Sequence, residues 1–316
     1  MWMPARRLRL LGLLAFAALA TTRVSAQGAD PARIAAATRT AQQAPACQAL
    51  GDFYWEIGDA TGVLGSGQIG SSYSATSSIK IASASKWVFG AWFVQKYGQP
   101  NPQQLAELEM QSGYTSFNPF KCIFTRKVEG CFGAGGNNQF KPQDVGRFSY
   151  GGGHSQKLAL DLGLGGLSSD DLTREIMGAL GISGLSYSHP QLAGGLEGAP
   201  AAYAAFLRKI VSGQLRMKQY LDYTPVFPLP GACPSAAYSP AKEAWHYSLD
   251  HWIEDAPGDD GAFSSPGAFG FYPWIAADKA TYGILARDKM SSDAYLRSAE
   301  CGARIRRAWF IKTPVT

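Results

Sequence analysis

Residues 79–86 read Ile-Lys-Ile-Ala-Ser-Ala-Ser-Lys, an extended apolar segment that runs into a serine and, three positions later, into a lysine. From Ala84 to about Tyr97 the apolar residues recur at helical spacing, so the pattern predicts a helix that begins at Ser83. Three residues along a helix bring Ser83 and Lys86 onto the same face. This junction therefore predicts a serine and a lysine side by side at the start of a helix.

The S-x-x-K motif at this place suits nucleophilic catalysis. Free backbone N–H groups at a helix N-terminus stabilise developing negative charge, including that of an oxyanion. A lysine held in a partly desolvated cleft loses its proton more easily and can activate a serine as a base. The alternative for Ser83 is an N-cap serine beside a surface lysine. A second S-x-x-K, from Ser239 to Lys242, lies in a Pro-containing loop that we interpret as a solvated turn.

Strand patterns occur near both ends of the chain and helical patterns in its middle. Aromatic and β-branched residues at 53–57 predict a strand, and a turn leads from it into a second strand. The motif G-x-G-x-x-G at 65–70 falls in this second strand with no helix after it, so we interpret it as part of a hairpin and not as a dinucleotide site. Further strands are predicted at 79–81, 245–253, 267–275 and 281–286, and helices at 31–45, 84–97, 170–180, 201–210 and 292–309.

These patterns predict an α+β fold, in which an antiparallel sheet built from both chain ends is flanked by helices and carries an inserted all-α lobe. We expect residues 27–102 and 235–316 to form one discontinuous α/β lobe, and residues 103–234 to form the helical lobe. A ligand cleft is expected between the lobes. The aromatic runs at 245–249 and 271–274 are interpreted as core of the sheet, with a wall of the cleft as the alternative.

Residues 1–26 have the pattern of a secretory signal peptide, with a basic start, an apolar run and the small-x-small site Val24-Ser25-Ala26. The alternative is an uncleaved N-terminal anchor. Four of the 29 Lys and Arg residues lie in this segment, which leaves 25 against 24 Asp and Glu, so the mature chain is near +1. We expect a periplasmic or secreted protein with no stable membrane anchor after cleavage and no nucleic-acid partner.

All five cysteines follow the predicted cleavage site, so they meet an oxidising compartment. Cys122 and Cys131 are close in sequence and predict a small disulfide-closed loop. Cys47 and Cys301 flank the two ends of the mature chain and can join them, which would leave Cys233 unpaired. The sequence leaves this pairing open. Because no CxxC pair and no Cys/His cluster at metal spacing occurs, we expect neither zinc nor another metal, and no cofactor.

The stretch around Ser83 resembles the serine β-lactamase and penicillin-binding-protein superfamily, and within it the branch of class C β-lactamases, D-alanyl-D-alanine peptidases and related esterases. Further segments are similar to the motifs of that family and occur in its order. They are Gln-Ser-Gly-Tyr at 111–114, Phe-Ser-Tyr-Gly-Gly at 148–152, Leu-Gly-Ile at 180–182, Leu-Ala-Gly-Gly-Leu at 192–196 and Ser-Pro-Gly-Ala-Phe-Gly at 265–270. The resemblance covers residues from about 50 to 290.

The resemblance implies roles for particular residues. Ser83 would be the acylated nucleophile, Lys86 its base or proton relay, and Tyr150 a second proton-transfer group near the leaving group. The backbone N–H groups of Ser83 and Ala268 would form the oxyanion hole. The substrate would further contact the segment from Ser265 to Ala268, including Gly267.

Two positions depart from the family pattern. Gly152 stands where the family has an Asn that holds the substrate amide, and His154 is expected to occupy part of that space. Ser265 stands where the family has a Lys or His, so a cation that would bind the carboxylate of a β-lactam is missing. An uncharged or differently charged ester or amide is therefore easier to accommodate than a β-lactam.

We expect an exported, β-lactamase-related serine hydrolase that cleaves an ester or amide through an acyl-enzyme on Ser83. One alternative is a true β-lactamase or a D-alanyl-D-alanine peptidase, and another is a catalytically degenerate binding or scaffold protein of the same fold. The expected partner is a small-molecule or cell-wall-type ester or amide substrate, and the expected oligomeric state is a monomer.

Overall fold

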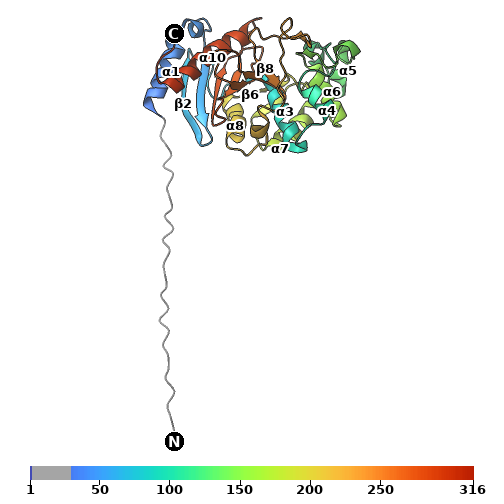
Figure 1. Ribbon diagram of the computed structural model, residues 1–316, viewed down its shortest axis with the longest axis horizontal. Coiled ribbons are helices and arrows are strands. Elements are labelled where there is room, and N and C mark those ends of the chain that lie inside the picture. The colour runs from blue at the N-terminus through green and yellow to red at the C-terminus, as the bar shows by residue number, and fades with distance from the viewer. Residues whose placement is uncertain (2–29) are drawn as a thin grey trace.

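The computed structural model of the chain describes Met1 and residues 30–316, so the predicted signal peptide lies outside the described residues after its first residue. A seven-stranded sheet in the order β2-β1-β12-β11-β10-β9-β8 forms the centre of the fold (Figure 1). Because β1 pairs antiparallel with β12, the two ends of the chain meet inside the sheet, as predicted. The strands are β1 (Phe53–Asp59), β2 (Gly62–Ile69), β8 (His246–Ser248), β9 (His251–Glu254), β10 (Ala262–Ser264), β11 (Tyr272–Ile275) and β12 (Thr281–Ala286).

Helices cover both faces of this sheet. Helices α1 (Pro31–Gln43) and α10 (Ala294–Ile311) pack on each other and on one face, where Trp55, Trp274 and Trp309 form a buried cluster. Helix α8 (Pro200–Val211) packs on the other face against β12 and β1. The apolar residues of β12 therefore alternate between two cores, as expected for a sheet that is buried on both sides.

The middle of the chain is mainly helix and loop, as predicted, with several short strands added. Strand β3 confirms the strand predicted at 79–81. The other strands of its sheet, β6 and β5, and the pair β4-β7 are strands of two or three residues and too short to give a periodic apolar pattern. Helix α8 belongs to the range assigned to the helical lobe but contacts the large sheet, and the lobe boundaries stay a prediction. The remaining elements are α2 (Pro45–Gln48), β3 (Ile79–Lys80), α3 (Ala84–Tyr97), α4 (Pro102–Leu108), η1 (Pro119–Cys122), α5 (Val128–Gly133), η2 (Ala134–Gly136), η3 (Pro142–Asp144), β4 (Phe148–Ser149), α6 (Gly153–Asp161), α7 (Ser169–Leu180), β5 (Leu185–Tyr187), β6 (Leu196–Gly198), α9 (Met217–Tyr220) and β7 (Ala236–Tyr238).

Two strand predictions near the C-terminus need correction. The segment 245–253 is a hairpin of β8 and β9 and not one strand, because Leu249 and Asp250 adopt φ values of 38° and 68° and reverse the chain. The strand predicted at 267–275 begins only at Tyr272, because residues 267–271 form a turn closed by the hydrogen bond from Gly267 N to Phe271 O. Strand β10 was not predicted.

The glycines of the G-x-G-x-x-G segment make room for tryptophan rings. Strands β1 and β2 pair as a hairpin, which confirms the interpretation from the sequence. A Cβ atom on Gly67 would lie 2.6 Å from the ring nitrogen of Trp55, and one on Gly65 would lie 2.9 Å from the ring of Trp309. The glycine spacing thus serves packing on this face of the sheet.

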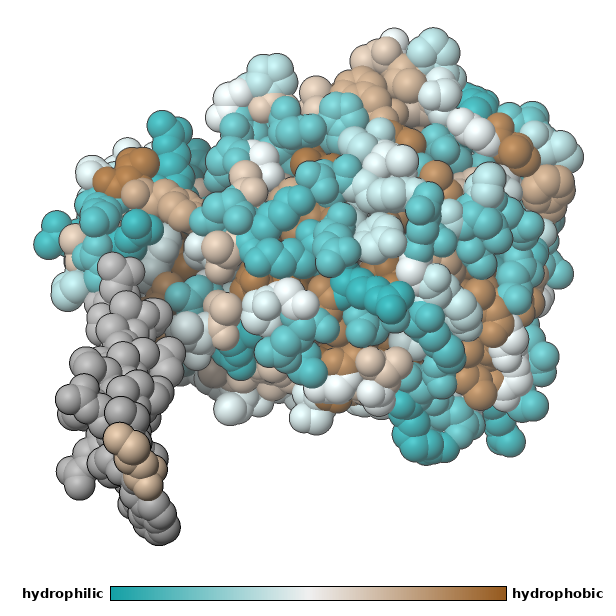
Figure 2. Space-filling model, turned by 60° about the horizontal axis from the view of Figure 1, so that its bottom comes forward, coloured by the Kyte–Doolittle hydropathy of each residue, from teal (hydrophilic) through white to brown (hydrophobic). Residues whose placement is uncertain are grey.

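Both predicted disulfides are present. Cys47 is bonded to Cys301, which ties α2 to α10, and Cys122 is bonded to Cys131 in the helical region. Cys233 is free and half-buried. Within residues 30–316 no helix combines the length and apolar character needed to cross a bilayer. On the face seen in Figure 2, hydrophobic residues form small patches between hydrophilic ones.

Candidate active site

The chain turns sharply between β3 and α3, and this turn places Ser83 at the start of the helix. Ala82, just before it, has a φ of 45°, a left-handed conformation that is strained for a residue with a Cβ atom. Ser85 holds the turn, because its Oγ donates to the carbonyl oxygen of Ala82 at 2.6 Å and accepts from the backbone N–H of Leu196 at 3.2 Å. Ser83 makes no side-chain capping hydrogen bond, so its hydroxyl is available for chemistry.

Lys86 is buried beneath Ser83. Its side-chain nitrogen lies 3.2 Å from Oγ of Ser83 and donates to the carbonyl oxygen of Ala193 at 3.1 Å. Burial lowers the pKa of Lys86 from 10.5 to about 8, although the carboxylate of Asp250 opposes this shift. The alternative of an N-cap serine beside a surface lysine is therefore wrong, and Lys86 has an appreciable neutral fraction near pH 8.

Tyr150 lies beside this pair. The side-chain nitrogen of Lys86 is 4.6 Å from the centroid of the Tyr150 ring, and the ring stacks on Trp252 with centroids 5.5 Å apart. Burial raises the pKa of Tyr150 above its ordinary value of 10, and hydrogen bonding to Ser83 opposes the rise only in part. The phenol is therefore protonated at neutral pH and can donate a proton.

The segment from Ser265 to Ala268 packs directly against the nucleophile. Oγ of Ser265 donates to the carbonyl oxygen of Ser83 at 3.1 Å, and a Cβ atom on Gly267 would lie 2.1 Å from the carbonyl oxygen of Ile81. Ala268 is exposed on the turn that follows. The backbone N–H groups of Ser83 and Ala268 donate to no other residue in the part of the chain that the structure describes.

Ser83 and Tyr150 open into a pocket of about 270 Å³. Among the described residues that line it, none is Asp, Glu, Lys, Arg or His. Pro240 and Ala241 form part of its wall, so the loop of the second S-x-x-K is more than the solvated turn that we predicted. The complete lining is Ser83, Tyr150, Tyr238, Pro240, Ala241, Trp245, Trp252, Pro266, Ala268, Ser292, Tyr295, Leu296 and Ala299.

The chain is similar to known proteins in its structure and not detectably in its sequence. No family model matches the sequence, and no curated protein matches it. Solved structures do match. The hydrolase EstCE1, described as having promiscuous acyltransferase activity, is 11% identical with a TM-score of 0.66, and the match covers 88% of this chain and 98% of that one. The D-amino acid amidase from Ochrobactrum anthropi SV3, solved with D-phenylalanine, gives 11% identity, a TM-score of 0.60 and coverages of 88% and 98%. A β-lactamase from Mycobacterium bovis is 14% identical with a TM-score of 0.53, and the match covers 81% of this chain and 95% of that one.

The chain has the β-lactamase-like fold. The resemblance to the serine β-lactamase and penicillin-binding-protein superfamily is thus confirmed for the fold, together with the predicted α+β class. At these identities the similarity concerns the fold alone. Catalytic roles in this β-lactamase-like chain depend on the geometry of its own residues.

Two predicted binding residues lie away from the pocket. A Cβ atom on Gly152 would lie 2.4 Å from the ring of Phe117, so this ring fills the space in which the family carries an Asn side chain. His154 is buried in α6, where Nδ1 lies 2.7 Å from Oγ of Ser112 and Nε2 lies 2.9 Å from the carbonyl oxygen of Ser149. Burial lowers the pKa of His154 to about 4, so this histidine is neutral and links segments behind the pocket.

Asp250 is a buried carboxyl group near Lys86 that sequence reasoning missed. Its Oδ1 accepts from Oγ of Ser155 at 3.4 Å, while Oδ2 has no hydrogen-bond partner among the described residues. Burial raises the pKa of Asp250, and the charge of Lys86 opposes this rise. The only local signal was an acidic residue inside the segment 245–253, which we predicted as one strand. Its position beside Lys86 depends on packing of that turn against α3, where Gly90 leaves room for the carbonyl oxygen of Leu249.

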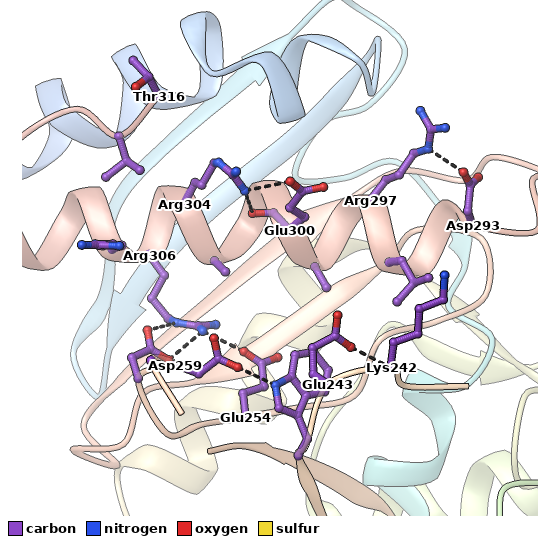
Figure 3. A pocket seen from close by; sticks show the side chains of 18 residues that line it. Lys242, Glu243, Glu254, Asp259, Asp293, Arg297, Glu300, Arg304, Arg306 and Thr316 are labelled. Carbon is purple, nitrogen blue, oxygen red and sulfur yellow. Dashed lines mark hydrogen bonds and ion pairs between the residues drawn. The ribbon is translucent and has the colours of Figure 1, made fainter. Parts of the chain in front are cut away.

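A second, charged groove of about 840 Å³ borders the pocket along α10 (Figure 3). The two cavities share Trp245, Leu296 and Ala299. Arg306 pairs with Glu254 at 2.7 Å within the groove, and further pairs of opposite charge lie along α10. Most of its cations are thus paired with neighbouring carboxylates, and Ser83 is not part of its wall. Among residues 30–316 no group of His, Cys, Asp and Glu side chains is arranged to hold a metal ion.

Proposed function

We propose that the chain is a serine hydrolase that cleaves an uncharged ester or amide through an acyl-enzyme on Ser83. One observation carries this proposal: the side-chain nitrogen of the buried Lys86 lies 3.2 Å from Oγ of Ser83, at the wall of a pocket. A nucleophile and a base within hydrogen-bond reach, with a depressed base pKa, are the requirements for covalent catalysis by serine.

The proposed reaction starts with neutral Lys86, which accepts the hydroxyl proton as Oγ of Ser83 attacks the substrate carbonyl carbon. The oxyanion that forms accepts hydrogen bonds from the backbone N–H groups of Ser83 and Ala268. Tyr150 donates a proton to the departing alkoxide or amine as the ester or amide bond breaks, and Lys86 returns its proton to Tyr150. Water then attacks the acyl-enzyme, with the same groups moving its proton, and releases the acid and free Ser83.

The lining of the pocket favours an uncharged, apolar or aromatic substrate group. Its described residues include the aromatic side chains of Tyr238, Trp245, Trp252 and Tyr295, and no cation that could pair with a carboxylate. Ser265, at the family position of a Lys or His, is occupied by its hydrogen bond to Ser83. Neighbours of the same fold include an amidase solved with D-phenylalanine and a hydrolase with acyltransferase activity, which supports an ester or amide substrate.

The test compares the mature protein with Ser83→Ala and with Ser239→Ala. The second variant changes the serine of the other S-x-x-K and serves as the matched control. Nitrophenyl esters of acetate and of phenylacetate, N-acetylphenylalanine nitroanilide and a chromogenic cephalosporin are the substrates. We expect cleavage of the aromatic ester or amide by the wild type and by Ser239→Ala, and none by Ser83→Ala. Intact-mass measurement after treatment with a phosphonate should give an adduct that Ser83→Ala lacks.

The same assay decides between the alternatives. Cephalosporin turnover as efficient as ester turnover would replace the proposal by a true β-lactamase. Absence of both turnover and a phosphonate adduct on the wild type would overturn every enzymatic interpretation and leave a binding protein of this fold.

We also propose that the protein is exported. Two disulfides support this proposal, because such bonds persist in oxidising compartments. Expression of the full chain in a bacterium, followed by osmotic-shock fractionation and N-terminal sequencing, should yield a soluble periplasmic or secreted chain that begins at Gln27. An intact N-terminus on a membrane-bound chain would contradict the proposal.

A further inference from the structure

Residues 117–141, which we name the aromatic loop, expose large apolar side chains at the surface. Four of the twelve exposed large hydrophobic residues of the described chain lie in it. Phe120 is 68% exposed, Ile123 49%, Phe124 90% and Phe140 51%. Single apolar side chains are common at protein surfaces, whereas their concentration in one short segment is typical of an interaction site.

The aromatic loop is held in shape and does not expose these residues through lack of structure. The Cys122–Cys131 disulfide joins η1 to α5. The buried side chain of Asn137 accepts a hydrogen bond from the backbone N–H of Asn118 at 2.7 Å and donates one to the carbonyl oxygen of Cys131 at 2.9 Å. The projecting phenylalanines are therefore attached to a segment whose conformation is fixed by a disulfide and by hydrogen bonds.

Positive charge is also concentrated in the aromatic loop. It contains four Lys and Arg residues and one Glu, a net charge of +3, although the mature chain as a whole is near +1. Within the described residues, Lys121, Arg126 and Lys141 have no carboxylate within ion-pair distance. Their charges are available to an external anionic surface.

The position of the loop leaves it free to meet such a surface. Helix α5 lies at the opposite end of the molecule from α1 and the C-terminus (Figure 1). At the start of the loop, the ring of Phe117 packs on Gly152, two residues after Tyr150 of the candidate active site. The loop is thus packed on the segment that carries Tyr150.

We propose that the aromatic loop binds reversibly to the surface of a bilayer that contains anionic lipids. Phenylalanine side chains enter the boundary between headgroups and acyl chains, and flanking Lys and Arg residues attract anionic headgroups. A few projecting side chains give peripheral binding and not an anchor. This binding does not depend on the hydrolase activity proposed above.

Sedimentation with sucrose-loaded vesicles tests the proposal. One set of vesicles is pure phosphatidylcholine, and the other is an equal mixture of phosphatidylcholine and anionic phosphatidylglycerol. We expect the mature wild-type protein to sediment with the mixed vesicles, more weakly with pure phosphatidylcholine, and less as salt is added. The double variant Phe120→Ser, Phe124→Ser should lower partitioning by about tenfold or more.

Matched variants separate the loop from general surface effects. Phe310→Ser removes a phenylalanine that is 37% exposed on α10 and should bind like the wild type. Lys121→Gln with Arg126→Gln should weaken the preference for anionic vesicles, whereas Lys289→Gln should leave it unchanged. Circular dichroism confirms folding of each variant. Failure of the wild type to sediment with mixed vesicles, or equal binding by the double phenylalanine variant, would overturn the proposal, and the first result would point to a protein partner instead.

Discussion

The side-chain nitrogen of Lys86 lies over the ring of Tyr150, 4.6 Å from the ring centroid. The negative face of an aromatic ring attracts an ammonium group, whereas burial of the same group disfavours its charge. Burial is the larger effect here, because the pKa of Lys86 is lowered to about 8. Lys86 is thus held between a cationic and a neutral form near pH 8.

The first prediction concerns the pH dependence of activity. Because neutral Lys86 is the proposed base, kcat/KM should rise with pH through a midpoint of about 8, the pKa to which burial lowers this group. Replacement by Lys86→Met should lower kcat by roughly 10²- to 10⁴-fold, as for loss of a general base. Steady-state kinetics on a nitrophenyl ester provides the measurement. A flat profile from pH 6 to 10 would contradict the role of Lys86.

The second prediction assigns Asp250 an electrostatic influence on Lys86. A nearby carboxylate raises the pKa of Lys86 and opposes the effect of burial. Asp250→Asn should therefore move the acid limb of the kcat/KM profile to lower pH. Asp170→Asn, at an exposed position at the start of α7, is the control and should leave the limb unchanged. An unchanged limb in Asp250→Asn, in a variant that folds normally, would show that Lys86 does not sense this carboxylate.

The junction around Ser83 was predictable because its signals are local. Spacing along one helix fixes the relation of Ser83 to Lys86, and apolar periodicity gives α3 with the predicted bounds. The order of motifs along the chain led from this junction to Tyr150 and to the segment at Ser265, both of which contact the same region.

The rest of the site depends on contacts between distant segments. Asp250 reaches Lys86 through a hairpin turn, and Phe117 fills the side-chain space at Gly152 from another loop. His154 follows Gly152 in sequence, but α6 directs its ring inward to Ser112 and Ser149 and away from the pocket. Neither periodicity nor spacing contains this information, since each contact is fixed by packing.

The third prediction concerns the pair Gly152 and Phe117. Gly152→Ala places a Cβ atom 2.4 Å from the Phe117 ring, so it should lower the free energy of unfolding by about 1–3 kcal/mol. In the double variant with Phe117→Ala the added cost of Gly152→Ala should largely disappear, because the clash is gone. Urea denaturation of the wild type, the two single variants and the double variant gives the coupling free energy between the two positions. Additive effects of the two substitutions on the free energy of unfolding would mean that the Phe117 ring moves aside freely. Gly166→Ala, with open space around it, controls for the general effect of alanine.

The fourth prediction concerns Gly267, whose added Cβ atom would meet the backbone of Ile81 at 2.1 Å. Backbone cannot move aside as a side chain can, and Ile81 lies two residues before the nucleophile. Gly267→Ala should therefore lower stability by about 2 kcal/mol or more and reduce kcat by shifting Ser83. Gly178→Ala in the last turn of α7 has open space and should instead stabilise by about 0.5–1 kcal/mol. Thermal unfolding and ester hydrolysis measure both effects. Wild-type kinetics in Gly267→Ala would contradict the close packing inferred between this turn and Ile81.

The fifth prediction compares the two disulfides, which close loops of very different length. Their sequence separations are 254 residues for Cys47–Cys301 and 9 residues for Cys122–Cys131. Loop-closure entropy predicts that the longer crosslink stabilises by about 3 kcal/mol more than the shorter one. Because all four cysteines are fully buried, double replacement by alanine leaves similar cavities in both variants. Urea denaturation should therefore give a distinctly larger loss for Cys47→Ala with Cys301→Ala than for Cys122→Ala with Cys131→Ala. Equal losses, or the reverse order, would show that native-state packing and not the unfolded chain governs the contribution of these bonds.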